Sequence, residues 1–433
     1  MPRVLPAGVE LPSRTPKRDA RTVLTYDLEV VTPMVGGFAV PGKTAVDLRA
    51  KGLIPHDMPD DDIRPAEIMG NLRAWWRIRY ADRFTPFEHP LAELAAAEDA
   101  IFGSGANAGK VQIGVTVTRR GKKAGQYITQ APYSYALWPL APMSKHEKPD
   151  PCAVTIETRF TVTLRMPREL GAEISPAMDA WIAYGGVGAR TRRGCGSLRL
   201  WSCVVRIDGV DHKRTHPTRV PQQHGAKAEP DLTALPGSVL AWQDGPANKR
   251  APDAWAIALQ AYQGFRRGTD DRASRARSPY PEADTIRTLA GEWAREPSHP
   301  VQGFPRADLG LPIVVHFIGN GDPGASLIHA TDDQDKPHRF ASPVITKPLQ
   351  VGDKFRPMIA FLDSPNVWRR DAMLEVKDRD GKRTRLTRRI PPEDIELTAA
   401  DRALIGPMRG MPIREALEDH LQNLGWTRTD VSV

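Results

Sequence analysis

The stretch Gly185–Leu198, GGVGARTRRGCGSL, decides how this chain is interpreted, because it places five glycines and three arginines within fourteen residues. Glycine lets the backbone reach positive φ and lets its N–H groups approach a ligand closely. Arginine presents a permanent charge and a planar fork of donors that suits phosphate oxygens. The stretch therefore predicts a loop that holds a phosphate backbone without reading bases. The alternative is a surface loop with a solvated basic face. The candidate contacts are Gly186, Gly188, Arg190, Arg192, Arg193 and Gly194.

The composition favours a polyanionic or acidic partner. The 433 residues carry a formal net charge of +8, which bears on partners rather than on fold. Forty prolines argue against an all-helical bundle. The three cysteines form no zinc-ligand pattern and fit a reducing, cytoplasmic compartment. No signal peptide or membrane-spanning stretch is expected, and neither a metal nor a cofactor is predicted.

The elements around the glycine loop predict a βαββαβ arrangement. Alternating apolar and polar residues predict strands, and apolar residues at helical spacing predict helices. In chain order we expect a strand at 24–31, helices at 63–84 and 90–102, strands at 111–118 and 153–164, a helix at 174–184 and a strand at 197–205. The loop, at 185–197, then lies between the second core helix and the last strand of a ferredoxin-like domain.

The domain organisation follows from shifts in composition. Residues 1–20 are rich in proline and charge and are expected to form a flexible basic arm. The ferredoxin-like domain is expected to span 21–208, and the apolar-poor segment 209–235 to be a linker. A second mixed α/β domain is expected over 236–433, with a helical insertion at 251–300.

Two further segments combine arginine with aromatic residues. The helix Leu72–Arg79, LRAWWRIR, offers Arg73, Trp76 and Arg77 to a nucleic acid, since bases stack on aromatic rings and guanidinium groups. The alternative is that its tryptophans fill the core while the arginines are solvated. The segment Phe265–Tyr280 offers Arg266 and Arg277 as phosphate contacts; here the alternative is a solvated insert.

Catalytic patterns are weak. The scattered histidines form no HExxH or other metal spacing, and no phosphate-binding lysine motif is present. His338 could be proposed for acid–base cleavage of RNA. The carboxylates of Asp60–Asp62 could bind a metal, but three adjacent carboxylates in a loop more often form a solvated run. We therefore assign no catalytic residue and no metal ligand.

The glycine loop, followed directly by a strand, resembles the signature loop of the CRISPR RAMP superfamily. Other segments extend the resemblance to the two-domain RAMP subunit of Cmr-type (type III-B) effector complexes, the one located at the crRNA 3′ end. They are TPMVGGF (Thr32–Phe38), IRPAEIMGNLRAWWR (Ile63–Arg77), RSPYPEADTIR (Arg277–Arg287), GLPIVVHF (Gly310–Phe317) and RFASPVITKP (Arg339–Pro348). Cys195 departs from the aromatic residue common in similar loops.

This resemblance implies an α+β fold of two ferredoxin-like RAMP domains with helical and loop insertions. It implies a non-catalytic RNA-binding subunit of an antiviral ribonucleoprotein, which binds the crRNA 3′ region or the facing target RNA and caps the complex beside other RAMP subunits. No membrane, cofactor or small-molecule substrate is implied. The alternatives are a RAMP-family crRNA-processing endoribonuclease and an enzyme that binds a phosphate ligand through the glycine loop.

Overall fold

The computed structural model describes most of the chain in several ranges. They are 21–36, 51, 63–84, 86–141, 154–207, 209–214, 239–243, 249–267, 278–294, 296–317, 319–331, 336–362 and 372–429. The expected basic arm at 1–20 and residues 215–235 of the expected linker lie outside them.

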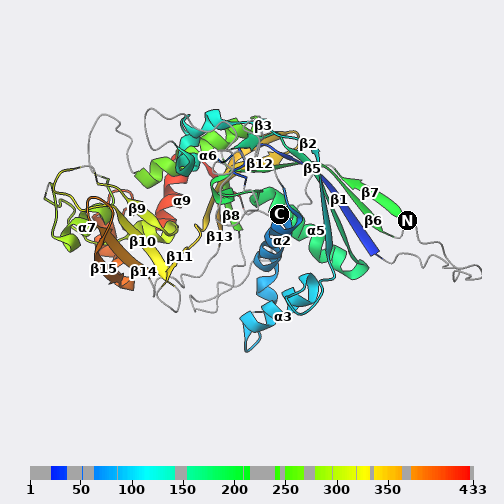
Figure 1. Cartoon of the computed structure of the whole chain (residues 1–433), viewed down its shortest axis with the longest axis horizontal. Coiled ribbons are helices and arrows are strands. Elements are labelled where there is room, and N and C mark those ends of the chain that lie inside the picture. Colours follow the sequence, from blue (N-terminus) through cyan, green and yellow to red (C-terminus); the bar gives the residue numbers. More distant parts are fainter. Residues whose placement is uncertain are drawn as a thin grey trace, which may run out of the picture.

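The first sheet has five antiparallel strands in the order β2-β5-β1-β6-β7 (Figure 1). These are β1 (Arg21–Val30), β2 (Gln112–Arg119), β5 (Arg159–Pro167), β6 (Leu198–Ile207) and β7 (Val210–Arg214). The alternation that predicts the first strand buries Leu24, Tyr26 and Leu28 on one face. Because β7 pairs with β6, the sheet extends to residue 214, into the segment expected to be a linker.

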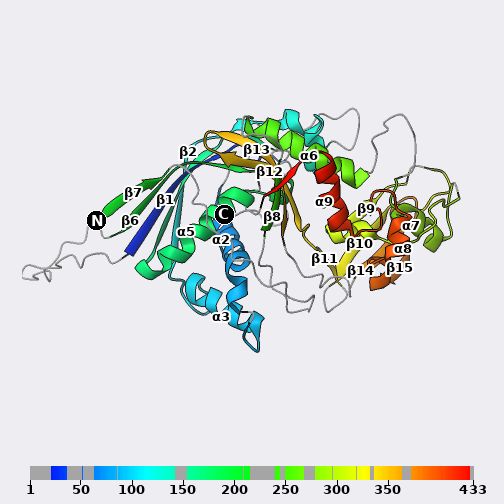
Figure 2. The same ribbon diagram turned by 180° about the vertical axis from the view of Figure 1, so that it is seen from behind.

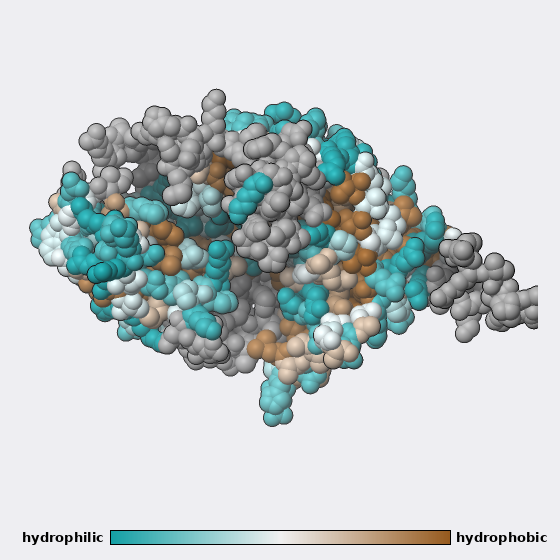
Figure 3. Space-filling view, viewed as in Figure 1, coloured by the Kyte–Doolittle hydropathy of each residue, from teal (hydrophilic) through white to brown (hydrophobic). Residues whose placement is uncertain are grey.

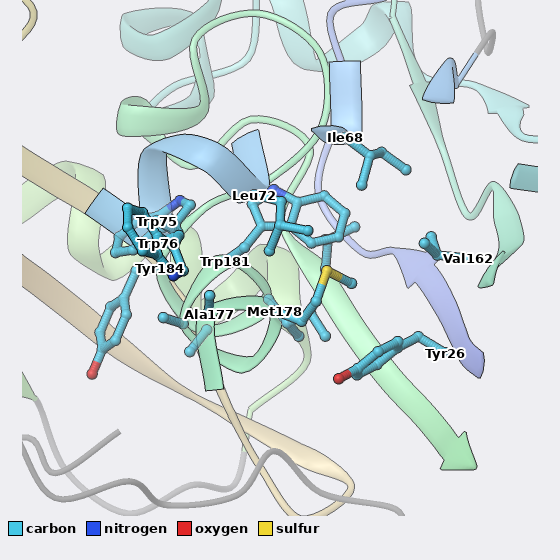
Figure 4. Packing of buried hydrophobic residues seen from close by; sticks show 14 of the residues in the cluster. Tyr26, Ile68, Leu72, Trp75, Trp76, Val162, Ala177, Met178, Trp181 and Tyr184 are labelled. Carbon is cyan, nitrogen blue, oxygen red and sulfur yellow. The ribbon is translucent and has the colours of Figure 1, made fainter. Parts of the chain in front are cut away.

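Two helices, α2 (Pro65–Tyr80) and α5 (Gly171–Tyr184), cover one face of this sheet, and α3 (Pro90–Phe102) packs against α2. Proline opens α2, where its missing N–H costs no helical hydrogen bond. The core lies between these helices and the strands, and Figure 4 shows Trp75 and Trp76 among its large side chains. The Trp75 ring stacks on Tyr184 with centroids 5.7 Å apart.

The second sheet has four antiparallel strands in the order β12-β13-β8-β16. These are β8 (Val239–Gln243), β12 (Val344–Val351), β13 (Lys354–Leu362) and β16 (Thr427–Thr429). Helix α6 (Ala251–Arg267) packs on β12 and β13, and α9 (Ile413–Asn423) packs on α6. In chain order this sheet and its helices run strand, helix, strand, strand, helix, strand.

The two sheets share one connectivity. In the first, the corresponding elements are β1, α2, β2, β5, α5 and β6, with α3 added after α2. The strands also lie side by side in matching orders, β2-β5-β1-β6 in the first sheet and β12-β13-β8-β16 in the second. In both sheets the strand that comes first in the chain lies between the third and the fourth. The expected mixed α/β fold with antiparallel sheets is confirmed.

A third sheet, of order β11-β10-β14-β15 with β9 paired to β10, lies at the far end of the molecule (Figure 2). Its strands are β9 (Ile313–Val315), β10 (Ser326–Thr331), β11 (Pro337–His338), β14 (Ala372–Lys377) and β15 (Thr384–Ile390). Helix α7 (Glu282–Ala290) precedes it, and α8 (Ala399–Ala403) follows it. Within the expected helical insertion at 251–300, α6 thus packs on the second sheet, while the side chain of Ile286 in α7 packs into the core of the third.

Short elements complete the described part. Strands β3 (Lys122–Lys123) and β4 (Thr155–Ile156) form a two-stranded ribbon, and α4 (Tyr133–Leu137) packs against α6.

A buried lysine joins the first two sheets. Lys347, in β12, donates hydrogen bonds from Nζ to the carbonyl oxygens of Gly185 (2.6 Å) and Ile182 (3.3 Å) at the end of α5. The last carbonyls of a helix lack intrahelical partners and carry partial negative charge, so a cationic donor suits this position. Burial nevertheless lowers the pKa of Lys347 to about 7. The side chain therefore titrates close to neutral pH while it holds the two sheets together.

We expect this lysine to impose a pH dependence on stability. Its pKa is lower in the folded protein than the roughly 10.4 of an unfolded chain, so between these values the unfolded state binds more protons. The free energy of unfolding therefore rises with pH above about 7. Relative to Lys347→Met, wild type should gain roughly 2 kcal/mol between pH 7 and pH 9, measured by urea unfolding. Lys354→Met, which removes an exposed lysine of the same hairpin, should give a curve parallel to wild type. If the free energies of unfolding of Lys347→Met and wild type also changed in parallel with pH, the proposed titration of Lys347 would be contradicted.

Candidate nucleic-acid interface

The glycine loop is packed against the chain's own backbone. Gly194 has a φ of +80°, and a Cβ there would collide with the Thr346 carbonyl oxygen and the Trp255 indole. A Cβ on Gly186 would lie 2.7 Å from the Gly196 carbonyl oxygen. Gly188, with a φ of +79°, donates its N–H to the Glu67 carboxylate. Close approach explains these glycines, but the partner that approaches is protein.

The loop arginines bind carbonyl groups. Arg190 donates from Nε to the Ala136 carbonyl oxygen, and Arg192 donates to the carbonyl oxygens of Ala341 (3.0 Å) and Ser342. Burial lowers the pKa of both guanidinium groups.

Arg193 binds the second sheet and its helix. It donates to the Val344 carbonyl oxygen (3.1 Å) and to the hydroxyl groups of Ser342 and Tyr262 (both 3.3 Å). Its guanidinium carbon lies 4.7 Å from the centroid of the Tyr262 ring. The three loop arginines thus anchor the loop to α4, to α6 and to the start of β12. Their contact with RNA stays a prediction.

The helix arginines are paired within the first domain. Arg73 and Arg77 converge on Glu98, at 2.5 Å and 2.6 Å, and Glu98 is buried. Arg73 also pairs with Asp99 at 3.3 Å. A buried carboxylate needs such partners, so this cluster fastens α2 to α3.

Trp76 belongs to the core, as the alternative interpretation of that helix expects. Only 1% of it is exposed, and its Nε1 donates to the Glu173 carboxylate at 3.3 Å. It offers no ring face to a base in this structure.

The last two candidates lie around the end of α6. Arg266 is half-buried, with its guanidinium carbon 5.9 Å from the centroid of the Tyr262 ring, the same ring that Arg193 contacts. The structure therefore brings Arg266 together with Arg193. Arg277 lies outside the described residues.

A basic hairpin that the sequence interpretation missed lies in the third sheet. The run Lys377–Arg389, KDRDGKRTRLTRR, has seven lysines and arginines against two aspartates. It forms the end of β14, the turn and most of the edge strand β15, where Arg383, Arg385 and Arg388 are exposed. Hydrophilic residues dominate this end of the molecule (Figure 3). The run of basic residues is visible in the sequence. Its residue types alone, however, do not distinguish a ligand-binding surface from the charges that protect an edge strand against aggregation.

The described ranges contain no cluster of three or more histidine, cysteine or acidic residues that could hold a metal ion. No helix within them is both long enough and apolar enough to cross a membrane.

One family model matches the part of the chain that contains the glycine loop. Residues 27–199, from β1 through the glycine loop to the start of β6, match the family model described as RAMP superfamily. Residues 27–199 are thus similar to the RAMP superfamily. Among curated proteins, none matches the chain.

Several solved structures are similar to this chain over most of its length. Cmr1 from Pyrococcus furiosus in its apo form is 16% identical, with 78% of this chain and 87% of that chain covered and a TM-score of 0.44. A chain in the cryo-EM structure of the Type III-B Cmr-beta bound to cognate target RNA is 10% identical, with 93% and 100% covered and a TM-score of 0.43. A chain of Cmr-beta bound to cognate target RNA and AMPPnP, in the presence of single-stranded DNA, is 11% identical, with 80% and 97% covered and a TM-score of 0.40.

The packed glycine loop predicts an unequal cost for two alanine substitutions. Gly209 has a φ of +84° and open space around it, so Gly209→Ala should lower the free energy of unfolding only by the backbone penalty of roughly 1 kcal/mol. Gly194→Ala adds a collision with the Thr346 carbonyl oxygen and should lower the free energy of unfolding by roughly 2–4 kcal/mol. Chemical denaturation of the two variants measures the difference. Equal losses would show that the loop is not clamped against β12.

Proposed function

We propose that this chain is a non-catalytic RNA-binding subunit of a type III-B CRISPR-Cas RNA-guided effector complex. In this proposal it binds the crRNA 3′ region, or the facing target RNA, and caps the complex beside other RAMP subunits. The observation that carries the proposal is the RAMP-superfamily match over residues 27–199. The resemblance of Arg277–Arg287 and Arg339–Pro348 to the Cmr-type subunit supports the finer assignment.

The repeated connectivity supports a two-domain architecture. We propose that β1 to β6 and β8 to β16 are two ferredoxin-like RAMP domains, since both have the βαββαβ order and the strand arrangement of that fold. The third sheet is then an addition to the second domain, inserted partly between α6 and β12 and partly between β13 and α9.

The distribution of cations supports RNA as the polyanion and suggests which residues meet its backbone. Because the loop arginines and the pair Arg73 and Arg77 contact protein acceptors, they are less available to phosphates. The exposed arginines of the basic hairpin, Lys377–Arg389, are better placed. We therefore propose that this hairpin contributes contacts to the RNA phosphates, which would be independent of base sequence.

Replacing two hairpin arginines should weaken RNA binding in a salt-dependent way. For single strands the slope of log affinity against log salt concentration is about −0.7 per phosphate contacted. Arg383→Ala together with Arg388→Ala should make the slope of the full chain shallower by about 1.4, measured by fluorescence anisotropy. The control is Arg250→Ala with Arg409→Ala, which removes two arginines already paired with Asp253 and Asp419. No RNA binding by wild type at low salt would contradict the proposed function, whereas an unchanged slope would contradict only the hairpin assignment.

The non-catalytic assignment separates the proposal from the endoribonuclease alternative. We expect the full chain to leave repeat RNA intact over several hours, with or without Mg²⁺, while binding persists in a gel-shift assay on the same sample. Cleavage that the His338→Ala variant abolishes would instead favour the processing enzyme, because His338 is the acid–base candidate in the sequence. Cleavage that persists in this variant would point to a contaminating nuclease.

A further inference from the structure

A β-bulge places a tryptophan on the open face of the first sheet. Along β1 the pairing with β6 shifts, so that Asp27 faces Ser202 while Leu28 faces Leu200. Trp201 is the extra residue between them, and bulges of this kind redirect side chains. Its neighbours Leu200 and Cys203 are buried, whereas 42% of Trp201 is exposed.

The Trp201 ring is held in position by polar contacts. Its Nε1 donates a hydrogen bond to the Glu29 carboxylate at 2.9 Å. The guanidinium carbons of Arg159 and Arg199 lie 4.8 Å and 5.1 Å from the ring centroid. Each cation near an aromatic face is favourable, and a ring fixed in this way loses little side-chain freedom when a ligand stacks on it.

Second contacts fix the groups that hold the ring. Arg159 makes a two-point pair with Asp27, at 3.1 Å and 2.6 Å. Arg119 pairs with Glu29 at 2.5 Å. The ring and its supports therefore form one network across β1, β2, β5 and β6.

A depression of about 470 Å³ adjoins the network on the same face. Its wall is polar: hydroxyl groups, one carboxylate and two guanidinium groups surround a single valine. It is lined by Thr25, Asp27, Thr118, Arg119, Arg159, Thr161, Ser202 and Val204. This volume lies in the range of small-ligand sites, and the donors and acceptors suit the polar edge of a base.

The charge of the face favours an anionic ligand. The outward side chains of the strands include the arginines at 119, 159, 165, 199 and 206, against the acids Asp27, Glu29 and Asp211. Among the described contacts, Arg165 has no ion pair, and it is exposed on β5 four residues beyond the depression-lining Thr161. A strand rises about 3.3 Å per residue, so Arg165 stands roughly 13 Å from that floor residue, a separation that a few nucleotides span.

We propose that this sheet face binds single-stranded RNA, with one unpaired base stacked on Trp201, its polar edge over the depression, and the adjoining phosphates directed toward Arg165. The inference rests on the proposed function, since it takes RNA as the ligand, and it adds a site separate from the glycine loop and the basic hairpin. An aromatic platform tolerates any base because every base has a π-face. The site therefore contributes affinity without sequence specificity.

The test uses the full chain, a fluorescently labelled oligouridine and an abasic strand of equal length. Trp201→Ala should lower the affinity for oligouridine roughly 5- to 100-fold and leave the affinity for the abasic strand unchanged. Trp201→Phe should retain most of the binding. The control Trp293→Ala removes a tryptophan of similar exposure, 47%, outside the first domain and should change neither affinity.

A second readout covers the case in which Trp201→Ala does not fold. Oligouridine should quench the tryptophan fluorescence of wild type more than that of Trp201→Phe, and the abasic strand should quench the two equally. Arg165→Ala should make the salt slope shallower by about 0.7.

The outcomes separate the two proposals. Equal affinity of wild type and folded Trp201→Ala for oligouridine, or equal quenching of wild type and Trp201→Phe, would overturn the stacking site while leaving the proposed function intact. Displacement of oligouridine by polyglutamate or by anionic vesicles at matched charge would overturn the preference for a base. Failure of wild type to bind either strand would overturn the proposed function itself.

Discussion

The close contact between the glycine loop and β12 is the constraint on which the arrangement of the first two sheets depends. Two adjacent residues of β12 make it: the Thr346 carbonyl occupies the space that a side chain at 194 would need, and Lys347 reaches the carbonyls that end α5. From α6, Trp255 is fully buried and donates its Nε1 to the Arg193 carbonyl at 2.7 Å. The loop backbone is thus held from β12 and from α6, and neither contact could form if the second sheet and its helix were displaced by even a few ångströms.

Local patterns carried most of the prediction for the first domain. The alternation in Leu24–Val31 and the helical spacing from Ile68 to Tyr80 are set by burial on one face, and burial leaves a direct trace in the sequence. The position of the glycine loop between a helix and a strand followed for the same reason. The repeated strand order of the second domain was harder to predict, because its first and second strands, β8 and β12, are separated by about a hundred residues that contain much of another sheet.

The function of the loop residues could not be predicted from their types alone. A guanidinium fork that fits a phosphate also fits two carbonyl oxygens, and a glycine that admits a ligand also admits a neighbouring strand. What distinguishes these cases is the acceptor, and for Arg192 the acceptors are Ala341 and Ser342, about 150 residues away. The role of Trp76 could not be predicted from its residue type either. Adjacent tryptophans on a helix point in different directions, and only the packing of α5 and α3 shows that both Trp75 and Trp76 are covered. The exposed Trp201 was missed for the opposite reason: a bulge depends on the register between two strands, and neither strand's sequence marks it.

The arginines of this chain therefore divide by what accepts their hydrogen bonds rather than by where they cluster in the sequence. The three arginines of the glycine loop donate to carbonyl and hydroxyl groups, and Arg73 and Arg77 of α2 pair with the buried Glu98, so the free energy of these contacts contributes to folding. Arg383 and Arg388 of the β14–β15 hairpin and Arg165 of the open sheet face are exposed, so a phosphate can replace the water around them. If RNA binds at the proposed sites, stability and RNA affinity should respond to different substitutions. Only for substitutions at the exposed sites would a loss of affinity leave the unfolding transition in place.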